Sequence, residues 1–392
     1  MSAASADAAY DVAIVGAGAA GATAALLLVR AGVRVALVRR RPRGFDRPAE
    51  ICSPATRRLM RALQLPMPDA TDDARVCRGV LSTWESSDPQ FYDYGLLACE
   101  AAIAIDRSSY DEALVAAART AGAAVICGDV AARVVHHRGN WTVEFDRTSL
   151  LARWLIDASG RGGGLAPTHT SRRCFSDRLV ACVIRQARCA ASGPCSDVLL
   201  LAAVRGGWWY VSQSATGAAS VVYLTDADLL PRSAYARSIH LGRAFDEASL
   251  LQEAIGAAPA FSPHRVVDAR TSHRLRVGGD GWMAIGDAAL SVDPLSGEGL
   301  RLAIASAARA CDAITDGGRG LPAWESLAAW YGDQRREQRH AAAGANAAVV
   351  RRFADDLFWR RRDAVDGLQP AVGPSASGNI QMSMRVVPPR RV

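Results

Sequence analysis

The stretch Asp11–Arg41, DVAIVGAGAAGATAALLLVRAGVRVALVRRR, decides the fold of this chain. Its apolar run Val12–Val15 predicts a buried strand, which ends in the turn Gly16–Gly21 ahead of a helical pattern. Gly32 ends that helix, and Val33–Val38 predicts a second buried strand. A strand, a G-x-G-x-x-G turn, a helix and a strand within about 30 residues form the context that makes the glycine motif specific. We therefore expect an α/β domain that binds a dinucleotide.

Each glycine of the turn has its own physical role in such a site. Gly16 permits the tight turn, Gly18 lets the backbone approach a pyrophosphate, and Gly21 lets the helix pack on the strand. The free N–H groups and the dipole at the helix N-terminus then hold the phosphate charge. The residues between the glycines are assigned to the same cofactor site, namely Ala17, Ala19 and Ala20.

The end of the second strand departs from the dinucleotide pattern. An Asp or Glu roughly 20 residues after the glycines usually binds a ribose 2′-OH, but Arg39 stands there, followed by Arg40 and Arg41. An arginine at this position is compatible with the 2′-phosphate of NADP. It is equally compatible with altered binding of the adenosine ribose, or with a solvated basic strand end. We include Arg39 and Arg40 among the candidate cofactor residues.

Composition and charge are those of an ordinary globular protein. The chain has 392 residues, 50% of them hydrophobic and 22% charged, which is enough for two domains or one large α/β unit. Its net charge is +7, and because it contains no Lys, Arg supplies the basic side chains apart from His. No basic face interleaved with aromatic residues is apparent, so we do not expect a nucleic-acid partner.

Cysteines and apolar runs indicate a cytoplasmic protein without a metal site. The nine Cys include no C-x-x-C pair and no zinc-ligand spacing, and therefore predict reduced thiols. The uncharged run Val12–Val29 fits a nucleotide-binding turn better than a membrane span, because it is rich in Gly and Ala. No basic n-region of a secretory signal precedes it.

The order of the patterns predicts a discontinuous domain organisation. The expected fold class is α/β, with a Rossmann-type cofactor domain, a second β-sheet substrate domain, two C-terminal helices near 322–353 and a tail of low order. The corresponding ranges are 10–80, 100–165 and 273–320 for the cofactor domain, 81–99 and 166–272 for the substrate domain, 321–365 for the C-terminal helices, and 366–392 for the tail.

Motifs that lie far apart resemble a known enzyme family when they are taken in order. These motifs are Gly16–Gly21, Asp106-Arg107 with Tyr110-Asp111, Asp157–Arg161 (DASGR), and Gly286-Asp287 followed by Pro294–Gly299 (PLSGEG). The series resembles the large family of single-chain FAD enzymes with a glutathione-reductase-type nucleotide fold. That family includes aromatic hydroxylases, tryptophan halogenases and geranylgeranyl reductases.

Finer marks narrow the resemblance, which spans residues 10–362. They are similar to the halogenase-like monooxygenases that hydroxylate a tryptophan ring during maturation of protein-derived quinone cofactors. The marks are Glu50 with Ser53-Pro54-Ala55, Ser82-Thr83-Trp84, Gly207–Tyr210, Thr225–Asp228, Ser272–Leu275 and Phe358–Arg362. Two departures argue against halogenation: the chain lacks the Lys on which flavin halogenases depend, and Trp208–Gln213 does not fit their W-x-W-x-I-P motif.

The resemblance assigns roles around FAD. Asp287 would bind the ribityl hydroxyls, and Gly297, Glu298 and Gly299 would run close under the isoalloxazine ring. The helix that begins near Leu300 would stabilise the reduced, anionic flavin. Other residues assigned to FAD are Arg107 near the pyrophosphate, and Arg40, Val130, Asp157, Gly160, Gly286 and Pro294.

The resemblance also implies the reaction, oxygenation of an electron-rich ring through a flavin C4a-hydroperoxide. O2 would be the oxidant, and electrons would come from NAD(P)H or from a separate flavin reductase. The substrate would be an indole or tryptophan derivative that is free, peptide-borne or carrier-bound. A flavin-dependent dehydrogenase or reductase of the same fold, and a flavin-poor binding protein, are the alternatives.

Candidate catalytic and substrate residues are fewer. Glu50 and His273 are candidates for orienting the substrate or moving a proton. The aromatic residues Trp84, Trp208, Trp209 and Tyr210 are candidates for lining a dry substrate pocket. For each of these residues the structural alternative, a core or surface side chain, stays open.

Overall fold

The computed structural model describes residues 9–40, 49–68, 74–128, 131–146, 148–162, 165, 171–186, 197–213, 219–255, 259–316 and 323–363. The chain forms two compact units. The first unit contains Met1–Ala74, Ile105–Arg178 and Asp268–Glu337, and the second contains Arg75–Ala104, Leu179–Val267 and Gln338–Val392. The tail predicted at 366–392 lies outside the described residues. Assignment of the cofactor to one domain and of the substrate to the other stays a prediction.

The first unit is built on the sheet predicted from the glycine motif. Strands β1, β2, β8, β11 and β20 run parallel to their neighbours in the order β20-β11-β1-β2-β8. The strands of this sheet are β1 (Ala9–Val15), β2 (Val35–Arg40), β8 (Ala124–Gly128), β9 (Ala131–His137), β10 (Asn140–Phe145), β11 (Thr148–Asp157), β19 (Gly278–Gly279) and β20 (Trp282–Ala284). Strands β9, β10 and β11 form an antiparallel meander.

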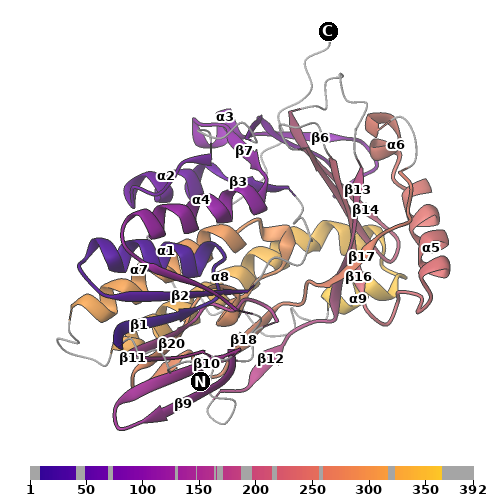
Figure 1. The fold of residues 1–392 in the computed structure, drawn as a ribbon. Coiled ribbons are helices and arrows are strands. Elements are labelled where there is room, and N and C mark those ends of the chain that lie inside the picture. Colours follow the sequence, from indigo (N-terminus) through magenta and orange to yellow (C-terminus); the bar gives the residue numbers. More distant parts are fainter. Residues whose placement is uncertain are drawn as a thin grey trace. The chain divides into compact units, whose positions relative to one another are not determined.

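Helices of the first unit cover one side of this sheet. Figure 1 shows α1, α4 and α7 together beside the parallel strands, and α1 packs against both of the others. The helices are α1 (Ala19–Arg30), α2 (Pro54–Ala62), α4 (Arg107–Thr120) and α7 (Gly299–Thr315), with the short 3-10 helices η2 (Gly286–Ala288) and η3 (Pro294–Ser296). The remaining strands are β3 (Glu50–Cys52), β12 (Arg173–Phe175), β18 (Ser272–Arg274) and β21 (Leu290–Ser291).

The second unit is built on a seven-stranded sheet, one face of which is covered by helices. Its strand order is β17-β13-β16-β15-β14-β5-β6, and α5 and α6 cover one face (Figure 1). The elements are β5 (Gly79–Thr83), β6 (Gln90–Asp93), β13 (Leu179–Gln186), β14 (Val198–Val204), β15 (Gly207–Gln213), β16 (Ala219–Asp226), β17 (Arg265–Asp268), α3 (Tyr94–Ala98), α5 (Ala234–Asp246) and α6 (Ser249–Ile255). Strand β4 (Arg75–Cys77) pairs antiparallel with β7 (Ala102–Ile105) outside this seven-stranded sheet.

The C-terminal helices differ from the prediction. Residues near 322–353 form one continuous helix, α8 (Ala323–Arg352), and the Phe358–Arg362 motif is itself helical in α9 (Leu357–Asp363). The continuous helix contains Gly332 and Gly344, although glycine in a helix interior costs about 1 kcal/mol relative to alanine. Both have room around them: a Cβ at Gly344 would meet no atom within 4 Å, and one at Gly332 would meet only the end of Arg336 at 3.7 Å.

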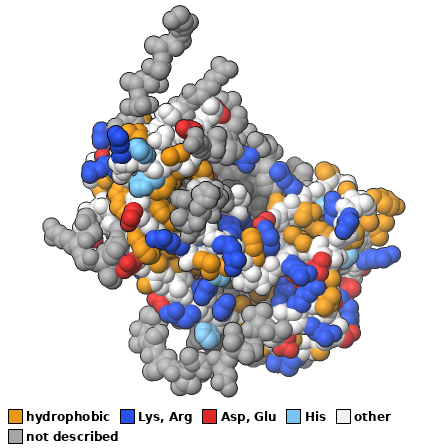
Figure 2. Space-filling view, turned by 90° about the horizontal axis from the view of Figure 1, so that it is seen from below, with side chains coloured by type: hydrophobic (Ala, Val, Ile, Leu, Met, Phe, Trp, Pro, Cys, Tyr) orange, Lys and Arg blue, Asp and Glu red, His pale blue; other side chains and the backbone are white. Residues whose placement is uncertain are grey.

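The described surface agrees with the composition. Figure 2 shows basic side chains in several groups with acidic side chains among them on the face that it presents. Several arginines of the described residues pair with acids, as in the Arg34–Asp11 and Arg270–Asp268 ion pairs. Within the part of the chain that the structure describes, no helix is both long and apolar enough to cross a membrane.

Candidate functional site

The glycine turn after β1 is tightly packed against the loop after β11. Gly16 has a φ of +110°, and its N–H donates to the carbonyl of Val38 at 2.9 Å. A Cβ at Gly16 would lie 2.2 Å from the carbonyl oxygen of Ala158, and one at Gly21 would lie 1.8 Å from that of Gly16. Neither position therefore accepts a side chain, which is the physical reason for glycine at both places.

The N-terminus of α1 is open to an anion. Its N-cap residue is Gly18, no side chain caps the helix, and its first turn contains no acidic residue. The first N–H groups of a helix need partners outside the helix. Together with the helix dipole, these uncapped donors fit the pyrophosphate of a dinucleotide.

The second glycine motif lies beside the first in the same unit. Gly286 has a φ of +58°, and a Cβ there would lie 2.9 Å from the Cβ of Ala20 on α1. Its N–H donates to Ser306 Oγ at 2.9 Å, and the Ser306 hydroxyl donates to the carbonyl of Ala303 at 2.9 Å. Helix α7 therefore fixes the Gly286 turn through a buried serine.

The backbone before and at the start of α7 borders open space at two glycines. We call Gly297 and Gly299 the glycine cradle: a Cβ at either position would meet no atom of the described chain within 4 Å. No side chain caps α7, its first turn carries no acidic residue, and Glu298 is engaged in an ion pair with Arg301. Leu300 is buried, and Pro294 begins η3. Open space bordered by unpaired N–H groups is what the predicted isoalloxazine site requires.

Arginines hold the Gly286-Asp287 loop in place. Asp287, with its side chain 36% exposed, forms a 3.2 Å ion pair with Arg161. Arg173 donates to the carbonyls of Asp287 and Ala288, at 2.9 and 3.1 Å, and also to that of Gly160 at 3.3 Å. Burial, followed by the neighbouring charge of Arg274, lowers the pKa of Arg173. Arg173 and Arg161 therefore hold the loop that would face the ribityl chain.

Asp157 is positioned as a turn residue. Its side chain is buried, its Oδ1 accepts from the backbone N–H of Ser159 at 3.1 Å, and Arg274 Nη2 lies 3.5 Å from Oδ2. Arg274 also donates to the carbonyl of Ala288 at 2.7 Å. These contacts favour a role for Asp157 in holding the turn at the end of β11 rather than in contacting the cofactor. Gly160, with a φ of +75°, keeps open space where a Cβ would stand.

Arg107 lies in a buried cluster with two acids. It donates to Glu50 Oε2 at 2.6 Å and to Asp111 Oδ1 at 3.1 Å, while Asp106 caps α4 through the N–H groups of the following serines. Burial lowers the pKa of Arg107, but Glu50 and Asp111 raise it by more. Glu50, predicted as a catalytic acid or base, is therefore tied to a guanidinium in this structure.

Arg39 is also paired. Its Nη1 donates to Glu112 Oε2 at 2.8 Å and its Nη2 to Glu112 Oε1, so the guanidinium and the carboxylate meet at two points. Arg40, the next residue, is exposed. An arginine already neutralised by an acid is a poor receptor for a 2′-phosphate. The contact therefore argues against the NADP interpretation of Arg39.

The four predicted pocket aromatics divide between the two faces of the second unit's sheet. Side chains alternate along β15, so Trp208 and Tyr210 share one face and Trp209 lies on the other. Trp209 is fully buried against α5 and α6, and its Nε1 donates to the carbonyl of Ala244 at 3.2 Å. Its placement favours the core alternative. Tyr210 is only half-buried.

Trp84 and Trp208 pack in an aromatic group with Trp359 of α9. The Trp84 ring lies 5.8 Å from that of Trp208 and 5.4 Å from that of Trp359, both edge to face. Its Nε1 donates to the carbonyl of Ala345 at 2.7 Å. Trp84, Trp208 and Trp209 are all buried, so Tyr210 is the most accessible of the four predicted pocket residues.

Two sequence motifs used for the resemblance contact each other. Arg361 pairs with Asp226 at 2.7 Å and with Asp228 at 2.8 Å, and Arg362 pairs with Asp226 at 3.1 Å. Trp359 Nε1 donates to the carbonyl of Val204 at 2.9 Å. The Phe358–Arg362 motif thus anchors α9 to the end of β16.

The remaining predicted residues have simpler placements. His273 lies on β18, half-buried, opposite Cys174 and Leu290 in the sheet. Val130 lies outside the described residues. No sequence pattern pointed to Arg173 or Ser306, whereas Arg161 and Arg274 occur within the motifs DASGR and SHRL.

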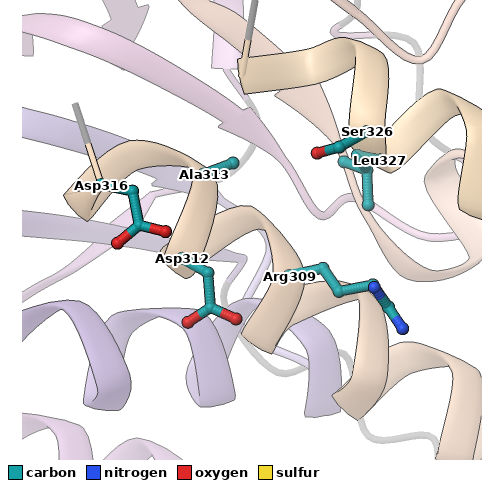
Figure 3. A pocket seen from close by; sticks show the side chains of 6 residues that line it. All are labelled: Arg309, Asp312, Ala313, Asp316, Ser326 and Leu327. Atoms are coloured by element: carbon teal, nitrogen blue, oxygen red, sulfur yellow. The ribbon is translucent and has the colours of Figure 1, made fainter. Parts of the chain in front are cut away.

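A small pocket lies apart from the glycine motifs, toward the other end of α7. Figure 3 shows its lining, which comes from the last turns of α7 and the first turn of α8: Arg309, Asp312, Ala313, Asp316, Ser326 and Leu327. Its volume is about 150 Å³, whereas pockets for small-molecule ligands have volumes of about 300–1,000 Å³. We do not assign it to the cofactor.

Ser306 provides a direct test of the Gly286 turn. We expect Ser306→Ala to lower FAD affinity about tenfold, because a buried N–H without a partner costs about 1–3 kcal/mol. Thr315→Ala, which removes a hydroxyl bonded only within α7, is the matched control and should leave the affinity unchanged. The measurement is a flavin fluorescence titration, and equal losses in both variants would contradict the role of Ser306.

Known proteins resemble this chain in sequence and in fold. The chain is 25% identical over 374 residues to LodB of Marinomonas mediterranea, which is named as an FAD-dependent oxidoreductase, with coverage of 92% of this chain and 99% of that protein. Its fold matches the flavin-dependent halogenase CmlS with a TM-score of 0.79 and 22% identity, covering 91% of this chain and 68% of CmlS. It also matches the peptidyl tryptophan dihydroxylase QhpG with a TM-score of 0.74 and 24% identity, covering 94% of this chain and 82% of QhpG.

These likenesses confirm the predicted α/β fold and the resemblance to halogenases and hydroxylases. The family model described as FAD binding domain matches residues 9–345, a range that includes the α1 turn, the Arg107 cluster and the glycine cradle. The chain therefore belongs to the FAD binding domain family and is an FAD-dependent oxidoreductase.

Proposed function

We propose that this chain is an FAD-dependent monooxygenase that hydroxylates an electron-rich aromatic substrate, an indole or tryptophan derivative. The observation that carries the proposal is that the chain shares the fold of a flavin-dependent halogenase but contains no Lys. The likeness to a peptidyl tryptophan dihydroxylase adds support for the substrate class. The substrate panel below tests whether the ring is free or peptide-borne.

The chain's own residues would bind the cofactor along the first unit. The uncapped N–H groups of α1 would bind the pyrophosphate, Asp287 would accept hydrogen bonds from the ribityl hydroxyls, and the glycine cradle would admit the ring. The N–H groups at the start of α7 would stabilise negative charge on the pyrimidine edge. Bound, reduced FAD supplies the activation of O2.

The second unit offers a candidate aromatic face for the substrate. Tyr210 lies on the sheet face opposite α5 and α6, beside Trp208 at a ring distance of 6.1 Å. Packing of an aromatic substrate on such a face would exclude water, which oxygen activation by flavin requires. Burial of Trp208 against Trp84 keeps this face rigid.

The test combines product analysis with a pair of matched variants. With reduced flavin and ¹⁸O₂, we expect one ¹⁸O atom per hydroxylation in a panel of indole, free tryptophan, a phenol and tryptophan peptides. Tyr210→Leu should lower kcat/KM about tenfold and increase the H2O2 released per product, because water enters the site. Trp209→Phe, on the other face, should leave this ratio unchanged.

The alternatives predict different outcomes. A dehydrogenase or reductase would turn over without O2 when an artificial electron acceptor is present. A flavin-poor binding protein would stay colourless after incubation with FAD. Either result would contradict the proposal. Comparing NAD(P)H alone with NAD(P)H plus a flavin reductase would identify the electron source.

A further inference from the structure

An ion pair stands where a dinucleotide site of this type usually has a single acid. Arg39 is the fifth residue of β2 and follows Val38, whose carbonyl accepts the N–H of Gly16. It is therefore adjacent to the first glycine of the phosphate-binding turn. Its side chain is 15% exposed, and its guanidinium is held at two points by Glu112 of α4, whose side chain is 58% exposed.

The pair offers both kinds of hydrogen-bonding group to a ligand. A guanidinium has five N–H donors, and a bidentate contact with one carboxylate uses two of them. The carboxylate of Glu112 keeps free acceptor capacity, because each of its oxygens has more than one lone-pair site. A ribose diol, whose hydroxyls donate and accept, matches this combination of groups.

The charges of Arg39 and Glu112 disfavour a 2′-phosphate on the adenosine ribose. Hydrogen bonds from Arg39 lower the pKa of Glu112, with Arg119 of the same helix contributing more weakly, so the carboxylate is ionised at neutral pH. Arg39 and Glu112 cancel each other's charge, and the more exposed partner is the acid. A 2′-phosphate would approach an exposed anion and an arginine already in use.

We infer that the Arg39–Glu112 pair recognises the adenosine ribose of FAD as an unphosphorylated diol and discriminates against a 2′-phosphate. Glu112 is thus a specificity residue on α4, and Arg39 acts through it rather than as a free cation. This inference concerns cofactor selection and stands apart from the proposed hydroxylation, because its test needs no turnover.

The test compares two ligands that differ only in the 2′-phosphate. Calorimetric titration of the full chain depleted of flavin, with 5′-AMP and with adenosine 2′,5′-bisphosphate, gives the ratio of their affinities. We expect wild type to bind 5′-AMP at least about tenfold more tightly. In Glu112→Gln we expect the ratio to reverse or to shift by about tenfold toward the bisphosphate, since a free arginine accommodates a 2′-phosphate.

Two controls separate this selection from a mere tether between β2 and α4. Arg34→Gln removes another exposed arginine, which pairs with Asp11 just before the other end of β2, and should leave the ratio unchanged. Arg39→Gln/Glu112→Gln should lose the gain in bisphosphate binding that Glu112→Gln produces. Equal weakening of both ligands in Glu112→Gln, an unchanged ratio, or failure of wild type to bind 5′-AMP would overturn the inference.

Discussion

Replacing Gly299 by leucine is expected to reduce FAD affinity by at least about a hundredfold while leaving the flavin-free protein folded. Gly299 is the first residue of α7, its φ is not positive, and a Cβ there meets nothing within 4 Å. Leucine is a better helix former than glycine by up to about 1 kcal/mol. The added side chain therefore costs the protein nothing but occupies the space of the glycine cradle, where the isoalloxazine ring would lie.

The matched control is Gly344→Leu. Gly344 is also helical, and a Cβ there would also meet no atom within 4 Å, but it belongs to α8 in the second unit. Equilibrium titration with FAD measures the affinity, and thermal unfolding of the flavin-free protein measures stability. If Gly299→Leu bound FAD as tightly as Gly344→Leu, the predicted position of the flavin would be wrong.

Arg107→Gln is expected to lower the free energy of unfolding by about 3 kcal/mol. Arg107 is buried between the carboxylates of Glu50 and Asp111, and its removal leaves two acids without their common cation. The free energy of unfolding is measured by urea denaturation. Because the cluster lies in the unit that contains the glycine motifs, we expect FAD affinity to fall as well.

Removal of one acid tests this explanation. Arg107→Gln/Glu50→Gln should recover part of the lost stability, because only one of the two carboxylates then loses its ion pair with Arg107. Glu50→Gln alone also examines the prediction that Glu50 is catalytic. A large loss of kcat with little change in stability would support a catalytic role, whereas unchanged kcat would assign Glu50 to the Arg107 cluster.

Local patterns were sufficient to predict the frame of the first unit. The turn at Gly16, the Gly286-Asp287 motif and the helix beginning after Gly299 are all encoded by short-range constraints. Glycine is required where a Cβ would come within about 2–3 Å of backbone atoms, as at Gly16 and Gly21.

Other features depend on which side chains meet, and no local pattern determines that. The sequence indicated neither that Glu50 pairs with Arg107 nor that Glu112 pairs with Arg39, since the partners lie on different elements. It also treated Trp208 and Trp209 alike, although the strand places them on opposite faces of the sheet.

The sequence by itself thus determined the α/β frame and the glycine turn after the first strand, because glycine requirements and apolar periodicity act over a few residues. The resemblance to FAD enzymes came instead from motifs that lie far apart in the chain. Tertiary structure alone decided the pairing of Arg39 with Glu112, the hydrogen bonds of arginines to the Gly286-Asp287 loop and the environment of each aromatic side chain of β15. These depend on contacts between distant segments, whose energies are set by burial and by ion pairing rather than by neighbouring residues.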